Sequence, residues 1–328
     1  MELSQPTFWM AGRLATDCVE ISTDPTCLDR PGFWAVVNTF EGQWFCARFA
    51  SVVDAPLPVA QWHGIDASWS SSQSQSEYQS NVEKIKEKIA AGDIYQVNLC
   101  RVLSTKSKQP LQGLANRLQQ DNPAPFASYL RLPNLEIASA SPELFLKRDG
   151  AMIKSTPIKG TSKTDNFGEK DRAENVMIVD LMRNDFGSIC ESGSVDVPRL
   201  LASEAHPGLS HLVSDVVGRL RENIKWSEIV KALLPAGSIS GAPKSSALKS
   251  ISEIEKVARG PYCGVIGWVQ GEQAVLSVGI RIFWSHGDGQ LNFGTGAGIT
   301  WASQPQGEWE ETELKAKRLI SIASGVLV

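Results

Sequence analysis

The sequence has few of the features that mark secreted, metal-binding or membrane proteins. Its 328 residues include six cysteines, at positions 18, 27, 46, 100, 190 and 263, and none forms a CxxC pair. This spacing excludes a zinc-ribbon pattern and favours reduced, mostly buried thiols without a catalytic role. No apolar run approaches the roughly 20 residues of a membrane helix, and MELSQPTFWMAG lacks the start of a signal peptide. We therefore expect a cytoplasmic protein with no membrane partner.

An excess of one charge is also missing. The formal net charge is −4, and no Lys/Arg cluster outweighs the acids around it. This pattern argues against a nucleic-acid partner and favours a small-molecule ligand. With 42% hydrophobic residues, the chain can bury one large core or two moderate ones.

The chain divides at a serine-rich stretch, SWSSSQSQS, which is typical of a surface connector. Residues 1–67 form a β-rich N-terminal region, since aromatic and β-branched residues dominate 33–37 and 43–49. Residues 76–328 form the larger region, and we expect one continuous fold.

Three helices are predicted with clear signals. Ser74 and Glu77 fit a capping box at the start of the first, and Gly92 supplies its stop. A second covers residues 169–185, and a third begins near Pro305. The predicted apolar stripe of the second helix consists of Ala173, Val176, Met177 and Leu181.

Residues 141–161, SPELFLKRDGAMIKSTPIKGT, predict two strands joined by a tight turn at Asp149 and Gly150. Glu143 and Lys159 then fall near the same end of the pair. They form either a cross-strand ion pair on a solvated sheet or an acid and an amine with a chemical role. Pro157 stiffens the approach to Lys159, and an amine shielded from water favours its nucleophilic form.

Three further features could bind ions. Glu308 and Glu311 share one helix face, and with Glu174 from another helix they would make a magnesium site, although acids in a first helical turn also favour the helix dipole. Arg281, inside the apolar run VLSVGIRIFW, is predicted to lie within a strand and to need a carboxylate from the protein or a ligand. The glycine cluster GTGAG, residues 294–298, follows a strand and leaves backbone amides accessible to an anion.

The segment PAGSISGAPKSS, residues 235–246, has no glycine immediately before its lysine and so does not match a phosphate loop. It is either a substrate-facing turn or a simple connector.

The chain resembles the chorismate-utilising enzymes. The resemblance covers residues 76–325 and is carried, in order, by SPELF, PIKGT, DRAENVMIVDLMRND, SHLVS, GSISGAPK, YCGVIGW, GAGI and EWEETELK. Within these enzymes it is similar to the aminodeoxychorismate synthase component I branch, because PIKGT has lysine where anthranilate synthases usually have alanine.

The resemblance implies roles for individual residues. Lys159 would attack C2 of chorismate, and Glu143 would be the general acid that protonates the departing 4-hydroxyl. Glu174, Glu308 and Glu311 would hold Mg²⁺. The residues implied in substrate binding are Arg281, Lys315, Gly296, Ala297, Gly298, His211, Tyr262 and Ser240.

The resemblance also implies an α+β fold, a sandwich of two antiparallel β-sheets with helices packed outside and the chorismate-binding site in residues 76–328. The reaction would be an amidotransferase-type amination of chorismate at C4 for p-aminobenzoate and folate synthesis. Ammonia would come from a separate glutaminase subunit, so we expect a heterodimer. Two alternatives remain, an anthranilate synthase and a non-catalytic chorismate-binding protein.

Overall fold

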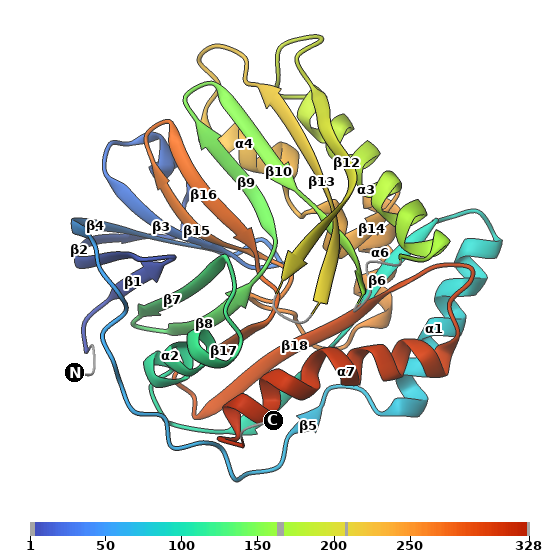
Figure 1. Ribbon diagram of the computed structural model, residues 1–328, viewed down its shortest axis with the longest axis horizontal. Helices are drawn as coiled ribbons and strands as arrows, with labels where there is room; N and C mark the ends of the chain where they lie inside the picture. The colour runs from blue at the N-terminus through green and yellow to red at the C-terminus, as the bar shows by residue number, and fades with distance from the viewer. Residues whose placement is uncertain (1–3, 163–166, 207–208, 327–328) are drawn as a thin grey trace.

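The computed structural model describes residues 4–162, 167–206 and 209–326. Within these ranges the strands form one continuous antiparallel network of eighteen strands, with helices packed against it. Figure 1 shows one group of strands below the other, and the two groups are joined where β1 (Thr7–Met10) pairs with β2 (Arg13–Ser22). The predicted α+β fold class is confirmed, with the two layers belonging to one hydrogen-bonded network.

The first group of strands carries the glycine cluster. Its neighbours, in spatial order, begin with β5 (Ser70–Ser71) and β14 (Gly241–Ala242), both paired with β6 (Gln96–Lys106). They continue through β18 (Gln290–Ile299), β17 (Ile282–Ser285), β8 (Leu135–Ser141) and β7 (Phe126–Leu132) to β1.

The second group carries the predicted strand pair of the acid and the amine. From β2 it passes through β4 (Trp44–Asp54), β3 (Phe33–Asn38), β15 (Val265–Gln270), β16 (Gln273–Val278), β9 (Leu144–Asp149) and β10 (Met152–Thr156) to β13 (Leu209–Arg219). β11 (Ile158–Ser162) and β12 (Asp196–His206) both pair with β13.

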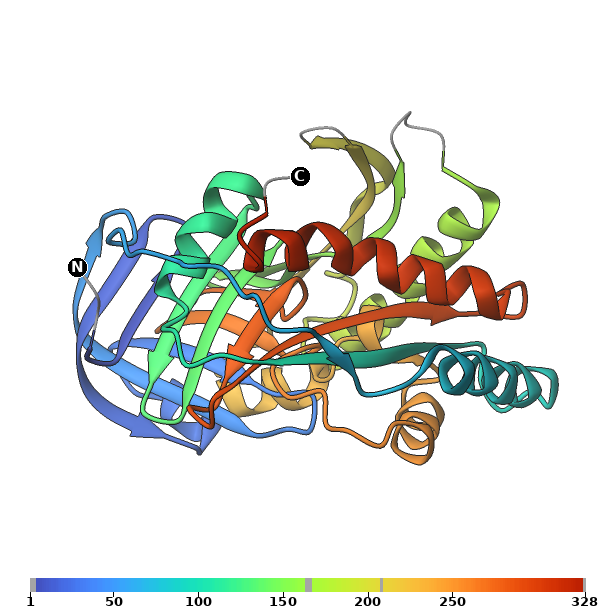
Figure 2. The ribbon, with the colours of Figure 1, turned by 90° about the horizontal axis from the view of Figure 1, so that it is seen from below.

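The helices lie outside these strands. They are α1 (Gln75–Ala90), α2 (Gln112–Asp121), α3 (Glu169–Gly187), α4 (Trp226–Leu233), α5 (Gly237–Ser240), α6 (Lys244–Ile254) and α7 (Pro305–Ala323), with a 3-10 turn η1 (Pro25–Asp29). Figures 1 and 2 both show α7 running along β18, while α3 packs on β11, β12 and β13. None of the helices in the described ranges is long and apolar enough to cross a membrane.

Local signals predicted several of these elements correctly. Ser74 and Glu77 form the capping box of α1, and Gly92, just beyond its end, has a φ of +82°. The turn between β9 and β10 lies at the predicted position, with Asp149 opposite Met152 and with Gly150 in the left-handed region at a φ of +59°.

The predicted buried face of α3 is wrong. Ala173 and Val176 are exposed, and the residues that α3 buries are Asn175, Ile178, Val179, Met182 and Phe186. The Asn175 side chain accepts a hydrogen bond from Ser214 Oγ at 2.5 Å and donates one to Leu212 O, both on β13. Because a buried amide needs hydrogen-bond partners, the face of α3 that carries Asn175 packs on β13 in place of the predicted apolar face.

Two strand boundaries also differ from the prediction. The apolar run around Arg281 is not one strand: β16 ends at Val278 and β17 begins at Ile282, and Arg281 lies in the break with a φ of +52°. The glycine cluster does not follow a strand, since β18 continues through it to Ile299, paired with β6 all the way.

The long β6–β18 pair is held by a buried arginine. Arg101 of β6 donates to Thr312 Oγ1 at 3.0 Å, pairs with Glu313, and lies 4.1 Å from the ring centre of Trp309. All three partners belong to α7. The contacts fix the helix against the strand pair and so determine which α7 side chains point toward β18.

Candidate functional site

The structure brings Lys159 and Glu143 together, as the sequence predicts. Glu143 directly precedes β9 and its side chain is buried, with 4% of the residue exposed. Lys159 lies on β11, and its Nζ donates a hydrogen bond to Ser238 O at 3.0 Å. The positive charge of Lys159 acts on the Glu143 carboxylate. Glu143 is therefore buried and Lys159 is partly buried beside it, rather than both lying on a solvated sheet.

Burial raises the pKa of Glu143 to about 7, against smaller opposing effects of Ser238, the Lys159 charge and the backbone of Ile158. An ordinary glutamate is fully ionised at that pH. A carboxyl group of this kind is about half protonated at neutral pH, and its protonated form can donate to a leaving group. The chemistry of Glu143 thus fits a general acid.

Ser238 is a residue that sequence reasoning missed. Its carbonyl accepts the Lys159 hydrogen bond, and its hydroxyl lies near Glu143 but makes no hydrogen bond within the described residues. The signal is the segment 235–246, in which the family resemblance points to Ser240 rather than Ser238. Ser240 is fully buried, and its hydroxyl donates to Ala236 O at 2.9 Å. Substrate contact by Ser240 stays a prediction.

Three carboxylates gather around one lysine. Lys170 Nζ lies 3.0 Å from Glu308 Oε1 and 3.8 Å from Glu174 Oε1. Burial lowers the pKa of Lys170, but the charges of Glu308, Glu174 and Glu311 outweigh it and leave the pKa raised. Gln96 Nε2 also donates to Glu174 Oε2 at 3.3 Å. Two members of this predicted acidic trio thus share the Lys170 ammonium, and the third, Glu311, acts on it through its charge.

The donor set suits a hard divalent cation. Glu308 Oε2 is buried and has no hydrogen-bond partner in the described part of the chain. This oxygen is therefore available to bind a metal ion. Burial raises the pKa of Glu174, whereas Glu311, also affected by burial, has its pKa lowered by Lys315. Across residues 4–162, 167–206 and 209–326, no three His, Cys, Asp or Glu side chains already form a metal-binding group. Glu174, Glu308 and Glu311 would hold Mg²⁺ only after their side chains move closer together.

Arg281 presents a largely buried cation. Burial lowers the pKa of its guanidinium, and the nearby charge of Arg318 lowers it further. No ion pair to Arg281 occurs within the described ranges. A desolvated guanidinium without a protein carboxylate is suited to a carboxylate on a ligand.

The glycine residues of β18 are required by close contacts rather than by a turn. A Cβ on Gly298 would lie 2.5 Å from Gln96 Nε2 and 3.5 Å from Glu174 Oε2, so this strand passes directly beside the acidic trio. Lys315 Nζ donates to Gly296 O at 3.0 Å and pairs with Glu311 at 2.7 Å. Ala297 is fully buried in the core with α1, so only its backbone could contact a ligand.

The two remaining predicted residues are both buried. His211 lies on β13 opposite Thr161 of β11 and Glu204 of β12, on the strand next to Lys159. The Tyr262 ring lies against Gly294, where a Cβ would be 2.0 Å from Tyr262 Cγ. Burial raises the pKa of Tyr262 well above its usual value. Their contacts with a substrate stay predictions.

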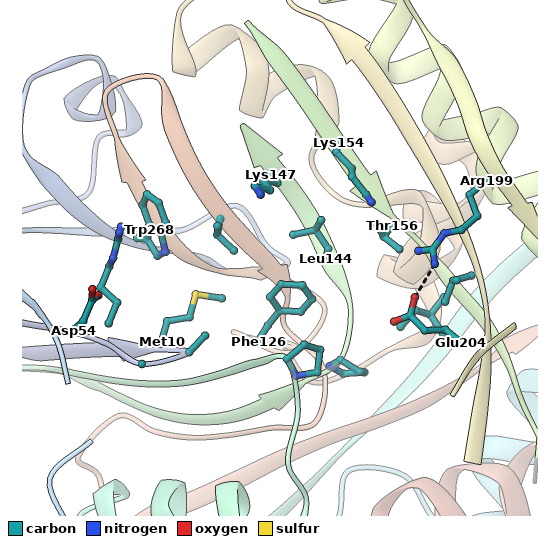
Figure 3. A pocket seen from close by; sticks show the side chains of 18 residues that line it. Met10, Asp54, Phe126, Leu144, Lys147, Lys154, Thr156, Arg199, Glu204 and Trp268 are labelled. Atoms are coloured by element: carbon teal, nitrogen blue, oxygen red, sulfur yellow. Dashed lines mark hydrogen bonds and ion pairs between the residues drawn. The ribbon is translucent and has the colours of Figure 1, made fainter. Parts of the chain in front are cut away.

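A second feature is a cavity of about 830 Å³, shown in Figure 3. It extends from Trp268 and Met10 to Lys154 and Arg199. Its lining includes Leu144 and Ile158, the chain neighbours of Glu143 and Lys159, but neither of those two. Because successive residues of an extended chain point to opposite faces, the cavity lies across the strands from the Lys159–Glu143 pair.

The geometry thus combines a partly buried amine, a carboxyl group with a raised pKa, three acidic residues near one lysine and a guanidinium without an ion pair in the described ranges. A family model described as chorismate binding enzyme matches residues 41–321. The chain belongs to the chorismate-binding enzyme family.

Individual relatives within this family carry different names. The chain is 38% identical over 273 residues to aminodeoxychorismate synthase component 1 of Escherichia coli K12. The aligned region covers 78% of this chain and 59% of that protein. The chain is 37% identical over 267 residues to anthranilate synthase component 1 of Aquifex aeolicus VF5, covering 77% and 54%. The chain thus spans little more than half the length of these curated relatives.

The fold matches solved structures along almost its whole length. The crystal structure of anthranilate synthase component I from Streptococcus pneumoniae TIGR4 matches with a TM-score of 0.83 at 22% identity and covers 98% of this chain and 93% of that chain. At this identity the match establishes the fold alone.

Proposed function

We propose that the protein aminates chorismate at C4 and forms 4-amino-4-deoxychorismate, with ammonia supplied by a separate glutaminase subunit. The observation that carries the proposal is Lys159, an amine held beside a carboxyl group whose pKa is about 7. A relative named aminodeoxychorismate synthase component 1, at 38% identity, supports it.

In the proposed reaction, Lys159 Nζ forms a bond to C2 of the ring. The two ring double bonds shift, the C4–O bond breaks, and Glu143 gives its proton to the departing hydroxyl, which leaves as water. Ammonia then bonds to C4 and passes one proton to the Glu143 carboxylate, the double bonds return, and the lysine nitrogen leaves C2 as the free amine. The net change is the replacement of hydroxyl by amino, with one water released.

The remaining residues would position the substrate. Arg281 and Lys315 would supply the positive charge that two carboxylates of the substrate need, and Lys315 reaches both Gly296 O of β18 and Glu311 of the acidic trio. Mg²⁺ held by Glu174, Glu308 and Glu311 would offset the charge of the ring carboxylate when bound. The bound substrate would complete the enclosure of the pair and limit competition from water.

Incubation with chorismate, Mg²⁺ and an ammonium salt, followed by mass spectrometry of the product, tests the proposal. We expect 4-amino-4-deoxychorismate, which retains the enolpyruvyl group. Anthranilate with released pyruvate would instead assign the chain to the second candidate, which is favoured by the 37% identical relative named anthranilate synthase component 1. Binding without turnover, in the presence of ammonium, would refute both.

A further inference from the structure

Lys170 is a partly exposed lysine whose ammonium lies beside two of the predicted metal ligands. It lies in the first turn of α3, four residues before Glu174, and its side chain remains 41% exposed. Residues four apart on a helix are neighbours, so Lys170 can approach the Glu174 carboxylate without any change in the backbone. Its ammonium extends further, to Glu308 Oε1 on α7. One lysine thus connects the two helices that carry the acidic trio.

Glu308 depends on this contact. Its side chain is only 5% exposed, and Lys170 is its one ion-pair partner among the residues that the structure describes. Its other oxygen has no hydrogen-bond partner in those ranges. A buried carboxylate without a cation is costly, so the Lys170 ammonium stabilises Glu308 in this arrangement.

The ammonium and a divalent cation would need the same oxygens. Mg²⁺ binds carboxylate oxygens at about 2.0–2.1 Å. Lys170 Nζ already lies at hydrogen-bonding distance from Glu308 Oε1 and near Glu174 Oε1. Two cations at the oxygens of the buried Glu308 side chain would repel each other. Binding of one therefore requires the other to withdraw, and the exposed stem of Lys170 gives it a route into solvent.

We propose that Lys170 is an internal cation that holds the acidic trio together and is displaced when a divalent metal binds, so that it sets the metal affinity of the site. The inference rests on the metal site of the proposed function. It assigns to Lys170 a positioning role and no contact with the reacting atoms.

Mn²⁺ binding, measured by electron paramagnetic resonance with the full chain, tests the proposal. If the ammonium occupies the site nine-tenths of the time, Lys170→Met should tighten Mn²⁺ binding about tenfold. The matched control is Lys244→Met, because Lys244 pairs with Asp185 near the other end of α3, at 2.6 Å. The control should change the affinity less than twofold. Equal or weaker Mn²⁺ binding by Lys170→Met would overturn the proposal.

A second measurement uses the unaltered protein. Acetylation of lysine amines, mapped by peptide mass spectrometry, should increase several-fold at Lys170 when Mg²⁺ is added, because the ammonium leaves its ion pairs. Lys256, whose side chain is 79% exposed, should react equally with and without Mg²⁺. Unchanged or reduced acetylation of Lys170 at saturating Mg²⁺ would refute displacement.

The two proposals fail in different ways. Absence of Mn²⁺ binding in both the wild-type protein and Lys170→Met would remove the metal site and the role of Lys170 with it. Wild-type binding with no gain in Lys170→Met would remove only the role of Lys170. Metal exchange without amination of chorismate would leave Lys170 in place and refute the proposed reaction.

Discussion

Lys159 and Ser238 lie 79 positions apart in the chain, and the Lys159 amine donates a hydrogen bond to the Ser238 carbonyl at 3.0 Å. The same serine lies beside Glu143. The segment 235–246 therefore fixes the amine of β11 and the carboxyl group before β9 relative to each other. A nucleophile and an acid that act on one substrate need this kind of fixed relationship.

Replacement of Lys159 tests the covalent step. Lys159→Ala should abolish the protein–ring adduct that accumulates with chorismate when ammonia is absent, and turnover should fall at least about a thousandfold, since the nucleophile is lost. Intact-protein mass spectrometry measures the adduct. Lys154→Ala is the control, because Lys154 lies on β10, lines the cavity and pairs with Asp215. An adduct of the same mass in Lys159→Ala would exclude this lysine.

The raised pKa of Glu143 predicts a pH-dependent stability. The folded carboxyl group has a pKa of about 7, whereas the unfolded one has its ordinary value of 4.5. Between these values the folded state binds more protons, so the free energy of unfolding should fall by about 3 kcal/mol in total as pH rises from 4.5 to above 7. Glu143→Gln should remove this slope. Urea unfolding at pH 5, 6, 7 and 8 provides the measurement, and parallel curves for the two proteins would contradict the assignment.

The acidic trio predicts a selective effect on metal dependence. Glu308→Ala should raise the Mg²⁺ concentration needed for half-maximal activity by at least about tenfold, because a metal-ligand carboxylate is lost. Glu310→Ala serves as the matched control, since Glu310 is exposed on the same helix and accepts a hydrogen bond from Gln306. An identical Mg²⁺ requirement in the two variants would exclude Glu308 as a ligand.

The buried ion pair of Arg259 and Glu255 predicts a large loss of protein stability when it is broken. The Arg259 side chain is 1% exposed, pairs with Glu255 at 2.7 Å, and donates to the carbonyls of Asn98 and Ile239. Arg259→Met should lower the free energy of unfolding by about 3–5 kcal/mol, because Glu255 would remain buried and unpaired.

The matched control for this variant is the exposed pair of Arg183 and Asp180. Arg183→Met should change the free energy of unfolding by less than about 1 kcal/mol, since exposed ion pairs contribute little. Urea unfolding of both variants is the comparison. A loss of the same size in both would show that the buried Arg259 network contributes no more to stability than an exposed ion pair.

Short-range patterns were sufficient for much of the scaffold. The capping box of α1, the turn at Gly150 and the start of α7 each depend on residues a few positions apart, and the structure has all three where the sequence places them. Motif order was sufficient for the family. The i,i+3 spacing of Glu308 and Glu311 was visible for the same reason, because one helical turn separates them.

Other features depend on contacts between distant segments. Asn175 decides the buried face of α3 through its bonds to β13, and apolar periodicity alone contains no information on that partner. Arg281 lies in a break between strands because β16 pairs with β9 and β15 in the second group of strands, whereas β17 pairs with β8 and β18 in the first. Ser238 and Lys170 were missed because a backbone carbonyl and a surface lysine have no local signal of a role.

The sequence by itself determined the family through the order of its motifs, and that resemblance implied the α+β class and the candidate roles of the amine, the acid and the three carboxylates. Only the tertiary structure decided that Glu143 is buried enough to hold a proton near neutral pH and that Lys170 lies among the carboxylates. Both facts arise from desolvation and charge between segments far apart in the chain, which exist only once the chain has folded.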